Sequence, residues 1–282
     1  MLTLAKMYRP ITATPLKCDY TYCEIEPCEA LKPYIRCFWG TRSPIANSVS
    51  KHLTNLVIPD TCMDILFKIN YTANKYDGLF CPIDEHPHQS EVSTDTDLTA
   101  TFAIRFYAWS AILFSDHDFR NNSIFSIEEF SQKLKSDLEP LLFDIPALKD
   151  KIYFTERFLI RRLNKNRINH TLLNSIYYMV SNCGRAKISE VCNYSSASEK
   201  QLERLFKYNI GVSPKTFSSL VRYQLLWRDM LFSSNYNVLD AVDKYGYTDQ
   251  AHLIHDFKKR HLMSPKEAIN YAMSDFYNTK SL

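Results

Sequence analysis

GYTDQAHLIHDFKKRHLMSPKEA, residues 246–268, is the stretch of sequence that decides the fold. A segment 51 residues upstream repeats its apolar spacing and its Ser-Pro-Lys string. The matched residues are Leu202, Phe206, Ser213, Pro214 and Lys215 in the first copy and Leu253, Phe257, Ser264, Pro265 and Lys266 in the second, with Tyr194 and Tyr245 in step upstream. Each copy predicts a short helix, a tight turn, a second helix and a Ser-Pro start to another helix, which is the helix-turn-helix arrangement.

The second helix of each copy has a capping signal and a free polar face. Ser198 with Gln201 forms a capping pair, and Asp249 occupies the equivalent position in the second copy. At 100° per residue, the apolar side chains gather on one side of the first helix. The free positions opposite are Lys200, Glu203, Arg204 and Lys207 in the first copy and Ala251, Ile254, His255 and Lys258 in the second, with Gln250 at the edge. An exposed helix face is the simpler interpretation of each residue alone, but two faces in register favour contact with bases in a major groove.

A single connecting helix is expected between the two copies. Pro214 suits a first helical turn, and apolar residues recur with helical spacing as far as Leu231. About 18 residues of helix would be about 27 Å long. Such a rigid element would set the two second helices roughly one duplex turn apart, about 34 Å, so that both enter the major groove on one side of DNA.

Charge is divided unevenly along the chain. Residues 1–148 carry 13 Lys and Arg against 19 Asp and Glu, a net −6, whereas residues 149–282 carry 21 against 12, a net +9. The basic half is expected to meet a polyanion, nucleic acid first and an anionic membrane second. A basic run between two predicted helices is interpreted as a solvated linker, with direct phosphate contact as the alternative; its residues are Arg161, Arg162, Lys165 and Arg167.

The first half is predicted to be rich in strands. Runs of β-branched and aromatic residues predict strands at 18–26, 35–41, 55–58, 65–69 and 100–106. Residues 70–97 are expected to form a long loop, or a pair of loops, around a short strand at 79–81. Ser126 and Glu129 predict a capping box that opens a helix through Leu134. Helices are predicted at 150–163 and 171–182, with Gly184 as the stop.

The expected fold class is α+β, with a β-rich sensor-like N-terminal domain followed by an all-α domain in which a linker helix joins two helix-turn-helix units. The predicted boundaries are 1–148 for a ligand-sensing or dimerisation domain, 149–170 for a basic helical linker, and 171–282 for the DNA-binding domain. No apolar run approaches the roughly 18 residues that span a bilayer, and the N-terminus lacks the apolar core of a secretory signal. We therefore expect a cytoplasmic protein without a membrane partner, its eight cysteines reduced.

The segment 184–268 resembles the double helix-turn-helix domain of the AraC/XylS family of bacterial transcription regulators. The ordered string that carries the resemblance is Gly246-Tyr247-x-Asp249-Gln250-x-His252, followed by Phe257 and Ser264-Pro265. The resemblance implies that the residues contacting bases are Lys200, Glu203 and Arg204 in the first unit and Ala251, Ile254 and His255 in the second. The chain departs from the family pattern at Cys192, at Ala241-Val242, and at Leu262-Met263, where the family has a glycine.

The first half is similar, over residues 8–145, to a β-rich N-terminal domain found in a subset of these regulators. The similarity lies in IPDTCMDILFKI (58–69) and TFAIRFYAWSAILF (101–114), and it implies a sensing or dimerising role. Arg105 and Trp109 are the candidates for the edge of a ligand pocket. The alternative is that Trp109 is a core residue and that Arg105 pairs with a carboxylate of the same domain.

The expected function is that of a bacterial sequence-specific DNA-binding transcription regulator, an activator, whose N-terminal domain modulates DNA binding in response to an unknown signal. The alternatives are a constitutive DNA-binding protein with an oligomerising N-terminal domain and a cysteine-dependent enzyme tethered to DNA. The expected partners are double-stranded DNA, RNA polymerase and a small-molecule or protein signal, with a homodimer left open.

No catalytic residue, cofactor or metal is expected. Five scattered glycines exclude a glycine-rich phosphate loop, and no nucleophile elbow or HExxH motif is present. Two groups of soft ligands lack the spacing of a zinc motif; they are Cys18, Cys23 and Cys28, and Cys81 with His86 and His88.

Overall fold

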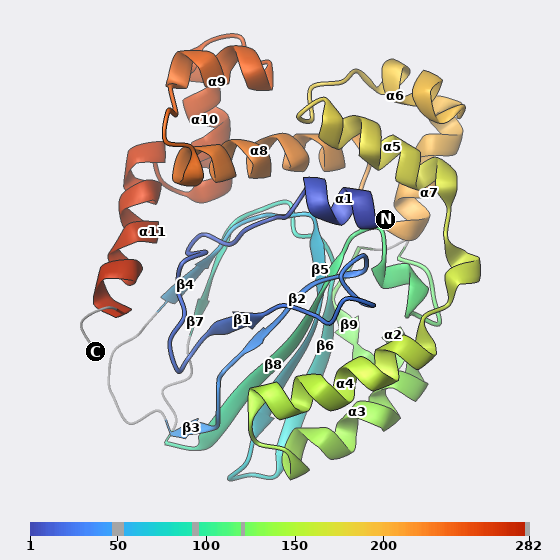
Figure 1. Cartoon of the computed structure of the whole chain (residues 1–282), viewed down its shortest axis with the longest axis vertical. Coiled ribbons are helices and arrows are strands. Elements are labelled where there is room, and N and C mark those ends of the chain that lie inside the picture. Colours follow the sequence, from blue (N-terminus) through green and yellow to red (C-terminus); the bar gives the residue numbers. More distant parts are fainter. Residues whose placement is uncertain (47–53, 92–95, 120–121, 280–282) are drawn as a thin grey trace.

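The N-terminal half is built around strand β5 (Cys62–Asn70), in which buried side chains alternate with more exposed ones. The computed structural model describes residues 1–46, 54–91, 96–119 and 122–279 (Figure 1). In the main antiparallel sheet the order is β1 (Cys23–Ile25), β2 (Ile35–Gly40), β8 (Leu98–Tyr107), β5, β6 (Lys75–Cys81) and β9 (Phe125–Ser126), and β3 (Ile45–Ala46) also pairs with β8. β4 (Thr54–Val57) and β7 (His88–Glu91) form a separate two-stranded sheet.

The register of the main sheet separates an apolar face from a polar one. On the apolar face the rings of Phe38 and Phe67 stack on Phe102 from both sides, with centroids 6.5 and 6.0 Å away. This face shares one hydrophobic core with buried residues of the helices that follow the sheet. On the other face Arg105 of β8 lies opposite Cys37 of β2 and opposite Asp64 of β5. The pleat therefore gathers the ionisable groups of the inner strands on one side.

Three predictions for the first half are wrong in part. The strand predicted at 18–26 forms only at Cys23–Ile25, and residues 18–22 lie in a loop. The strand predicted at 79–81 is confirmed as the end of β6, but the rest of 70–97 is not all loop, because β6 pairs with β5 over seven residues and β7 pairs with β4; residues 92–95 of the predicted loop lie outside the described residues. The helix predicted from Ser126 through Leu134 is two helices, α2 (Ile127–Phe130) and α3 (Gln132–Asp144). Ser131 adopts an extended backbone between them and caps α3 by accepting from Leu134 N–H.

The chain begins with α1 (Leu2–Met7) and has a short 3₁₀ turn, η1 (Ala111–Leu113), after β8. α4 (Leu148–Arg162) and α5 (His170–Ser181) confirm the two predicted helices that follow, with the turn η2 (Lys165–Arg167) between them. Gly184 ends this region with a φ of +71°, and a Cβ there would lie 2.3 Å from Ser218 O. Only glycine allows both this conformation and the close approach of the two backbones.

The C-terminal part is helical and contains two helix pairs on one long helix. The first pair is α6 (Ile188–Ser195) and α7 (Glu199–Asn209), and the second is α9 (Val238–Tyr245) and α10 (Gln250–His261). The predicted connecting helix is α8 (Pro214–Phe232), 19 residues or about 28 Å, and α11 (Pro265–Thr279) follows. Figure 1 shows the pairs at opposite ends of α8, above the sheet. The α+β fold class is thus confirmed.

No described helix combines the length and apolar character that a membrane span requires.

Candidate nucleic-acid interface

The turns that join the helices of each pair are built by left-handed residues and capping side chains. Ser196 ends α6 with φ 53°, and Gly246 ends α9 with φ 66°. Ser198 then accepts from Gln201 N–H while the Gln201 side chain accepts from Ser198 N–H, which is the predicted capping box. Asp249 accepts from His252 N–H at 2.7 Å in the second pair, as predicted.

The turn of the second pair is one residue longer than that of the first, because two residues lie between Gly246 and the cap Asp249 whereas one lies between Ser196 and the cap Ser198. The predicted correspondence of Tyr194 with Tyr245 is therefore wrong. Tyr245 is the last residue of α9 and is buried, whereas Tyr194 is 49% exposed and stacks on Tyr178.

α7 presents its polar face to solvent and buries the opposite face. Leu202 and Phe206 are fully buried in the core shared with α8. The four predicted contact residues on the other side are all exposed; they are Lys200, Glu203, Arg204 and Lys207. An exposed helical face with three cations and one carboxylate can donate to phosphates and to guanine and can accept from cytosine.

α10 presents a second face, which is less polar. Gln250, Ala251, His255 and Lys258 are exposed, whereas Ile254 is half-buried and packs at the edge of the second hydrophobic cluster. Arg260 turns away from this face, because its guanidinium donates to Asp256 and to the Ser219 hydroxyl of α8. Asp256 in turn accepts from the Tyr247 hydroxyl at 2.9 Å, so this carboxylate anchors α10 against the rest of the unit.

The basic run after α4 is not simply a solvated linker, and this prediction is wrong for two of its four residues. Arg162 pairs with Asp137 of α3, and Arg167 donates to the carbonyl oxygens of Ser115 and His117. Arg162 and Arg167 thus bind groups of the N-terminal half, and only Arg161 and Lys165 of the run are exposed. Local sequence could not reveal this because both partners lie 25 or more residues away.

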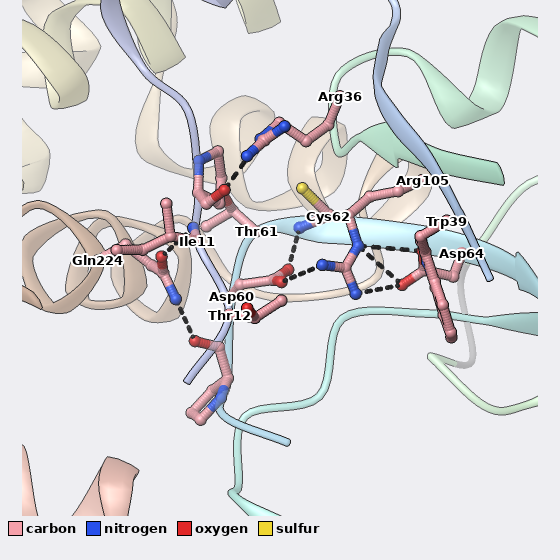
Figure 2. Close-up of polar contacts among 12 residues, drawn as sticks. Ile11, Thr12, Arg36, Trp39, Asp60, Thr61, Cys62, Asp64, Arg105 and Gln224 are labelled. Atoms are coloured by element: carbon pink, nitrogen blue, oxygen red, sulfur yellow. Dashed lines mark hydrogen bonds and ion pairs between the residues drawn. The ribbon is translucent and has the colours of Figure 1, made fainter. Parts of the chain in front are cut away.

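A second site joins the connecting helix α8 to the N-terminal half (Figure 2). Gln224, which is 1% exposed, uses both ends of its amide: its oxygen accepts from Ile11 N–H at 2.9 Å and its nitrogen donates to Pro59 O at 2.8 Å. Trp227, one turn along, donates from its indole to Thr12 O at 3.0 Å. The main chain at residues 10–13, called here the bridging segment, is therefore held directly by the helix that joins the two helix pairs.

The bridging segment is held on its other side by the main sheet. Arg36 of β2 donates to Pro10 O at 3.0 Å and pairs with Glu24 of β1 at 3.4 Å. Ile11 and Ala13 are buried in the same hydrophobic cluster as Trp227. The backbone of this short segment thus binds the sheet through Pro10 and α8 through Ile11 and Thr12, which couples the positions of the two halves of the molecule.

Arg105 lies immediately beyond this junction. Its guanidinium donates to both carboxylate oxygens of Asp64 and lies 3.8 Å from Asp60, the residue after Pro59. Burial by itself lowers the pKa of Arg105, but the two carboxylates outweigh it and raise the pKa well above its usual value. Burial raises the pKa of Asp60, and Arg105 opposes that shift. The Pro59–Asp60 turn therefore links the ion pair on the sheet to Gln224 on α8.

Arg105 and Trp109, the candidates for a pocket edge, occupy separate environments. Trp109 is 2% exposed, stacks on Tyr107 with centroids 4.4 Å apart, and donates to Pro33 O. The structure thus places Trp109 in the core and Arg105 in a carboxylate pair, as in the alternative interpretation. Among the described residues, no group of three or more His, Cys, Asp or Glu side chains is placed to hold a metal.

Gln224 and Trp227 are the functional candidates that the sequence analysis missed. The available signal was a polar residue within the apolar stripe of α8, since Gln224 lies one turn from Leu220 and from Trp227. A buried amide needs hydrogen-bond partners for both its oxygen and its nitrogen. Only the three-dimensional structure shows that these partners are the main-chain groups of residues 11 and 59.

Comparison with known protein families gives two matches that do not overlap. Residues 191–270 match a helix-turn-helix domain, and residues 23–121 match a domain of unknown function (DUF6597). The C-terminal part of this chain is therefore a helix-turn-helix domain, in agreement with the resemblance stated from the sequence. No curated protein matches the chain.

Similar solved structures include two proteins described as transcriptional regulators of the AraC type and one described as ToxT. A probable AraC family transcriptional regulator from Rhodopseudomonas palustris is 20% identical with a TM-score of 0.32, and the alignment covers 37% of this chain and 98% of that one. A transcriptional regulator from Chromobacterium violaceum is 19% identical with a TM-score of 0.34, over 36% and 91% of the two chains. ToxT from Vibrio cholerae is 12% identical with a TM-score of 0.40, over 82% and 97%.

Proposed function

We propose that this protein is a sequence-specific transcription regulator that binds double-stranded DNA through α7 and α10. The observation that supports this most directly is that two helix pairs, each with a capped second helix whose outer face is free, are fixed to the two ends of one rigid helix. In this proposal Lys200, Glu203 and Arg204 contact bases from α7. The base contacts of α10 come from Ala251, Ile254 and His255, while Lys207, Gln250 and Lys258 position the helices on the backbone.

The chain is divided in this proposal into an N-terminal sensing or dimerising domain (1–148), a basic helical linker (149–170) and the DNA-binding domain (171–282). The charge distribution supports the division, since the acidic first half is unsuited to contact DNA itself. RNA polymerase, a small-molecule or protein signal and a second copy of the chain are the further partners that we propose.

The N-terminal domain is proposed to modulate DNA binding through the bridging segment. Gln224 and Trp227 hold this segment from α8, and Arg36 holds it from the sheet. A change in the sheet near Asp60 or Arg105 would therefore act on the helix that sets the spacing of α7 and α10. Coupling of this kind is typically worth about 1–3 kcal/mol, and it works in both directions between signal and DNA.

The proposed base contact of Arg204 can be tested by selecting binding sites from random duplexes with the full-length protein. On the selected site, Arg204→Ala is expected to lose about 1–3 kcal/mol of binding free energy and to relax the preference at one or two positions, because a bidentate contact to guanine is lost. Lys258→Ala should weaken all sequences more evenly.

Lys133→Ala is the control for this experiment, since Lys133 is an exposed lysine of α3 in the N-terminal half. It should select the same site with unchanged affinity. If Arg204→Ala also returns the wild-type motif, Arg204 does not contact a base. If the wild-type protein enriches no motif at all, the proposed function fails.

A further inference from the structure

Two cysteines flank a tight loop that precedes β1. The backbone N–H of Asp19 donates to Tyr22 O at 2.9 Å, and the Asp19 carboxylate accepts two further N–H groups of the same loop. This closure places Cys18 and Cys23, the residues on either side, opposite each other. Facing residues of antiparallel segments have Cα atoms about 4.5–5.5 Å apart. A disulfide spans Cα separations of about 4.4–6.8 Å, a range that includes the separation expected for two residues that face each other in this way.

Arg42 lies close to both cysteines. Its guanidinium donates to Cys18 Sγ at 3.3 Å. The pKa of the Cys23 thiol is raised by burial and by the nearby Cys18 and is lowered by Arg42, so the three side chains are neighbours. Cys18 is exposed and Cys23 is buried, so an oxidant in solvent reaches Cys18 first. The third cysteine of this region, Cys28, is held elsewhere, because its backbone N–H donates to Glu156 of α4.

We propose that Cys18 and Cys23 form a reversible disulfide when the protein meets hydrogen peroxide. The sulfur of Cys18 attacks one peroxide oxygen, the O–O bond breaks, and the leaving hydroxide takes up the thiol proton as water, which leaves a sulfenic acid on Cys18. The sulfur of Cys23 then attacks the sulfur of Cys18 and expels hydroxide, which leaves as a second water with the proton of Cys23. Two thiols are oxidised, and one peroxide is reduced to two waters.

The loop is connected to the helix that leads toward the DNA-binding domain. Arg42 N–H donates to Tyr20 O at 3.2 Å, and Arg42 O accepts from the N–H of Leu148, the first residue of α4. The oxidation itself is a property of the loop, and it stands or falls independently of DNA binding.

The test treats the full-length protein with hydrogen peroxide, alkylates the remaining thiols and digests the protein with trypsin. The peptide from Cys18 to Arg36 contains Cys18, Cys23 and Cys28. It is expected to lose two hydrogens, about 2 Da, and to carry a single alkyl group, which fragmentation places on Cys28. A dithiol reductant applied before alkylation should restore three alkylated cysteines.

Cys28→Ser is the matched control and should still form the bond, whereas Cys23→Ser should stop at oxidised Cys18 and take up oxygen instead of losing two hydrogens. The proposal is overturned if the alkyl group of the oxidised wild-type peptide lies on Cys18 or Cys23. It is also overturned if both of these cysteines remain alkylated while other cysteines of the chain are oxidised.

Discussion

Leu262 has a backbone conformation that suits glycine. It ends α10 with φ 59°, where the first unit has Gly211 with φ 86°, and its side chain is 57% exposed. An L-residue in the left-handed region costs roughly 1–2 kcal/mol, and glycine avoids most of this cost. Leu262→Gly is therefore expected to raise the free energy of unfolding by about 1 kcal/mol, measured by urea denaturation. Lys259→Gly, inside the same helix, should lower it by about 1 kcal/mol.

His261 makes the stability of the second unit depend on pH. It is fully buried against Trp227 and Phe257, its Nδ1 lies 2.7 Å from the Tyr223 hydroxyl, and Nε2 has no hydrogen-bond partner among the residues that the structure describes. Burial lowers the pKa of His261 to about 3. Below about pH 6.5 the unfolded chain takes up a proton on this histidine, whereas the folded protein does not. The free energy of unfolding is therefore highest above pH 6.5 and decreases as the pH falls toward 3.

The expected loss from His261 is about 2 kcal/mol of unfolding free energy at pH 5, since each pH unit below 6.5 costs about 1.4 kcal/mol. Denaturant titrations at pH 7 and pH 5 measure it. His261→Gln, which keeps an acceptor for Tyr223, should lose that part of the pH dependence. An identical pH dependence in wild type and His261→Gln would mean that His261 does not titrate in this way.

At the scale of elements, α8 has two roles, since it spaces the two helix pairs and holds the bridging segment. Gln224→Leu leaves Ile11 N–H and Pro59 O buried without partners, so it is expected to cost about 1–3 kcal/mol of stability per group. Gln224→Glu keeps the acceptor for Ile11 but buries a carboxyl group whose second oxygen faces Pro59 O, so its cost should be larger at pH 7 and should decrease in acid, where the protonated carboxyl can donate to Pro59 O. If α8 transmits the state of the N-terminal domain, both variants should also change the DNA affinity of the full-length protein, measured by fluorescence anisotropy. Lost stability with unchanged affinity would make the contact purely structural.

The elements that were predicted correctly are those with local signals. Ser198 and Asp249 each accept a hydrogen bond from the N–H group three residues later, and Gly184 ends its helix through its own left-handed backbone conformation. Only the end of β6, at 79–81, was predicted, because the preceding run Lys75-Tyr-Asp-Gly78 is largely polar and ends in glycine. Its strand conformation comes from pairing with β5. Glycine suits position 78 because a Cβ there would lie 2.7 Å from Cγ2 of Ile127.

The candidate DNA-contacting residues could be predicted from helical periodicity and family resemblance, whereas the junction at Gln224 could not. Its partners are 213 and 165 residues away in the sequence. Ile254 shows a further limit of periodicity, since a position on the free side of α10 is half-buried by neighbouring elements.

At the scale of the whole molecule, binding to DNA should depend steeply on salt. The basic half has a net charge of +9, and a protein that contacts about six phosphates loses affinity by a factor on the order of 10³ between 50 and 200 mM salt. Anisotropy titrations of full-length protein and of residues 149–282 on the selected site, with and without cell metabolites, measure both this slope and the influence of the N-terminal domain. Equal affinities in all four conditions would remove the regulatory role and favour an oligomerising N-terminal domain.

The hydrogen bonds between α8 and the N-terminal half join side chains of α8 to main-chain atoms. Gln224 and Trp227 contribute side chains, whereas their partners at residues 11, 12 and 59 contribute only main-chain atoms. A carbonyl is present whatever residue occupies its position, and an N–H is present for every residue except proline. Substitutions can therefore accumulate on the N-terminal side without altering these bonds, while the two positions on α8 must be kept. Over evolutionary time, a different N-terminal domain can be joined to this DNA-binding domain, provided that its main chain follows the same path past α8.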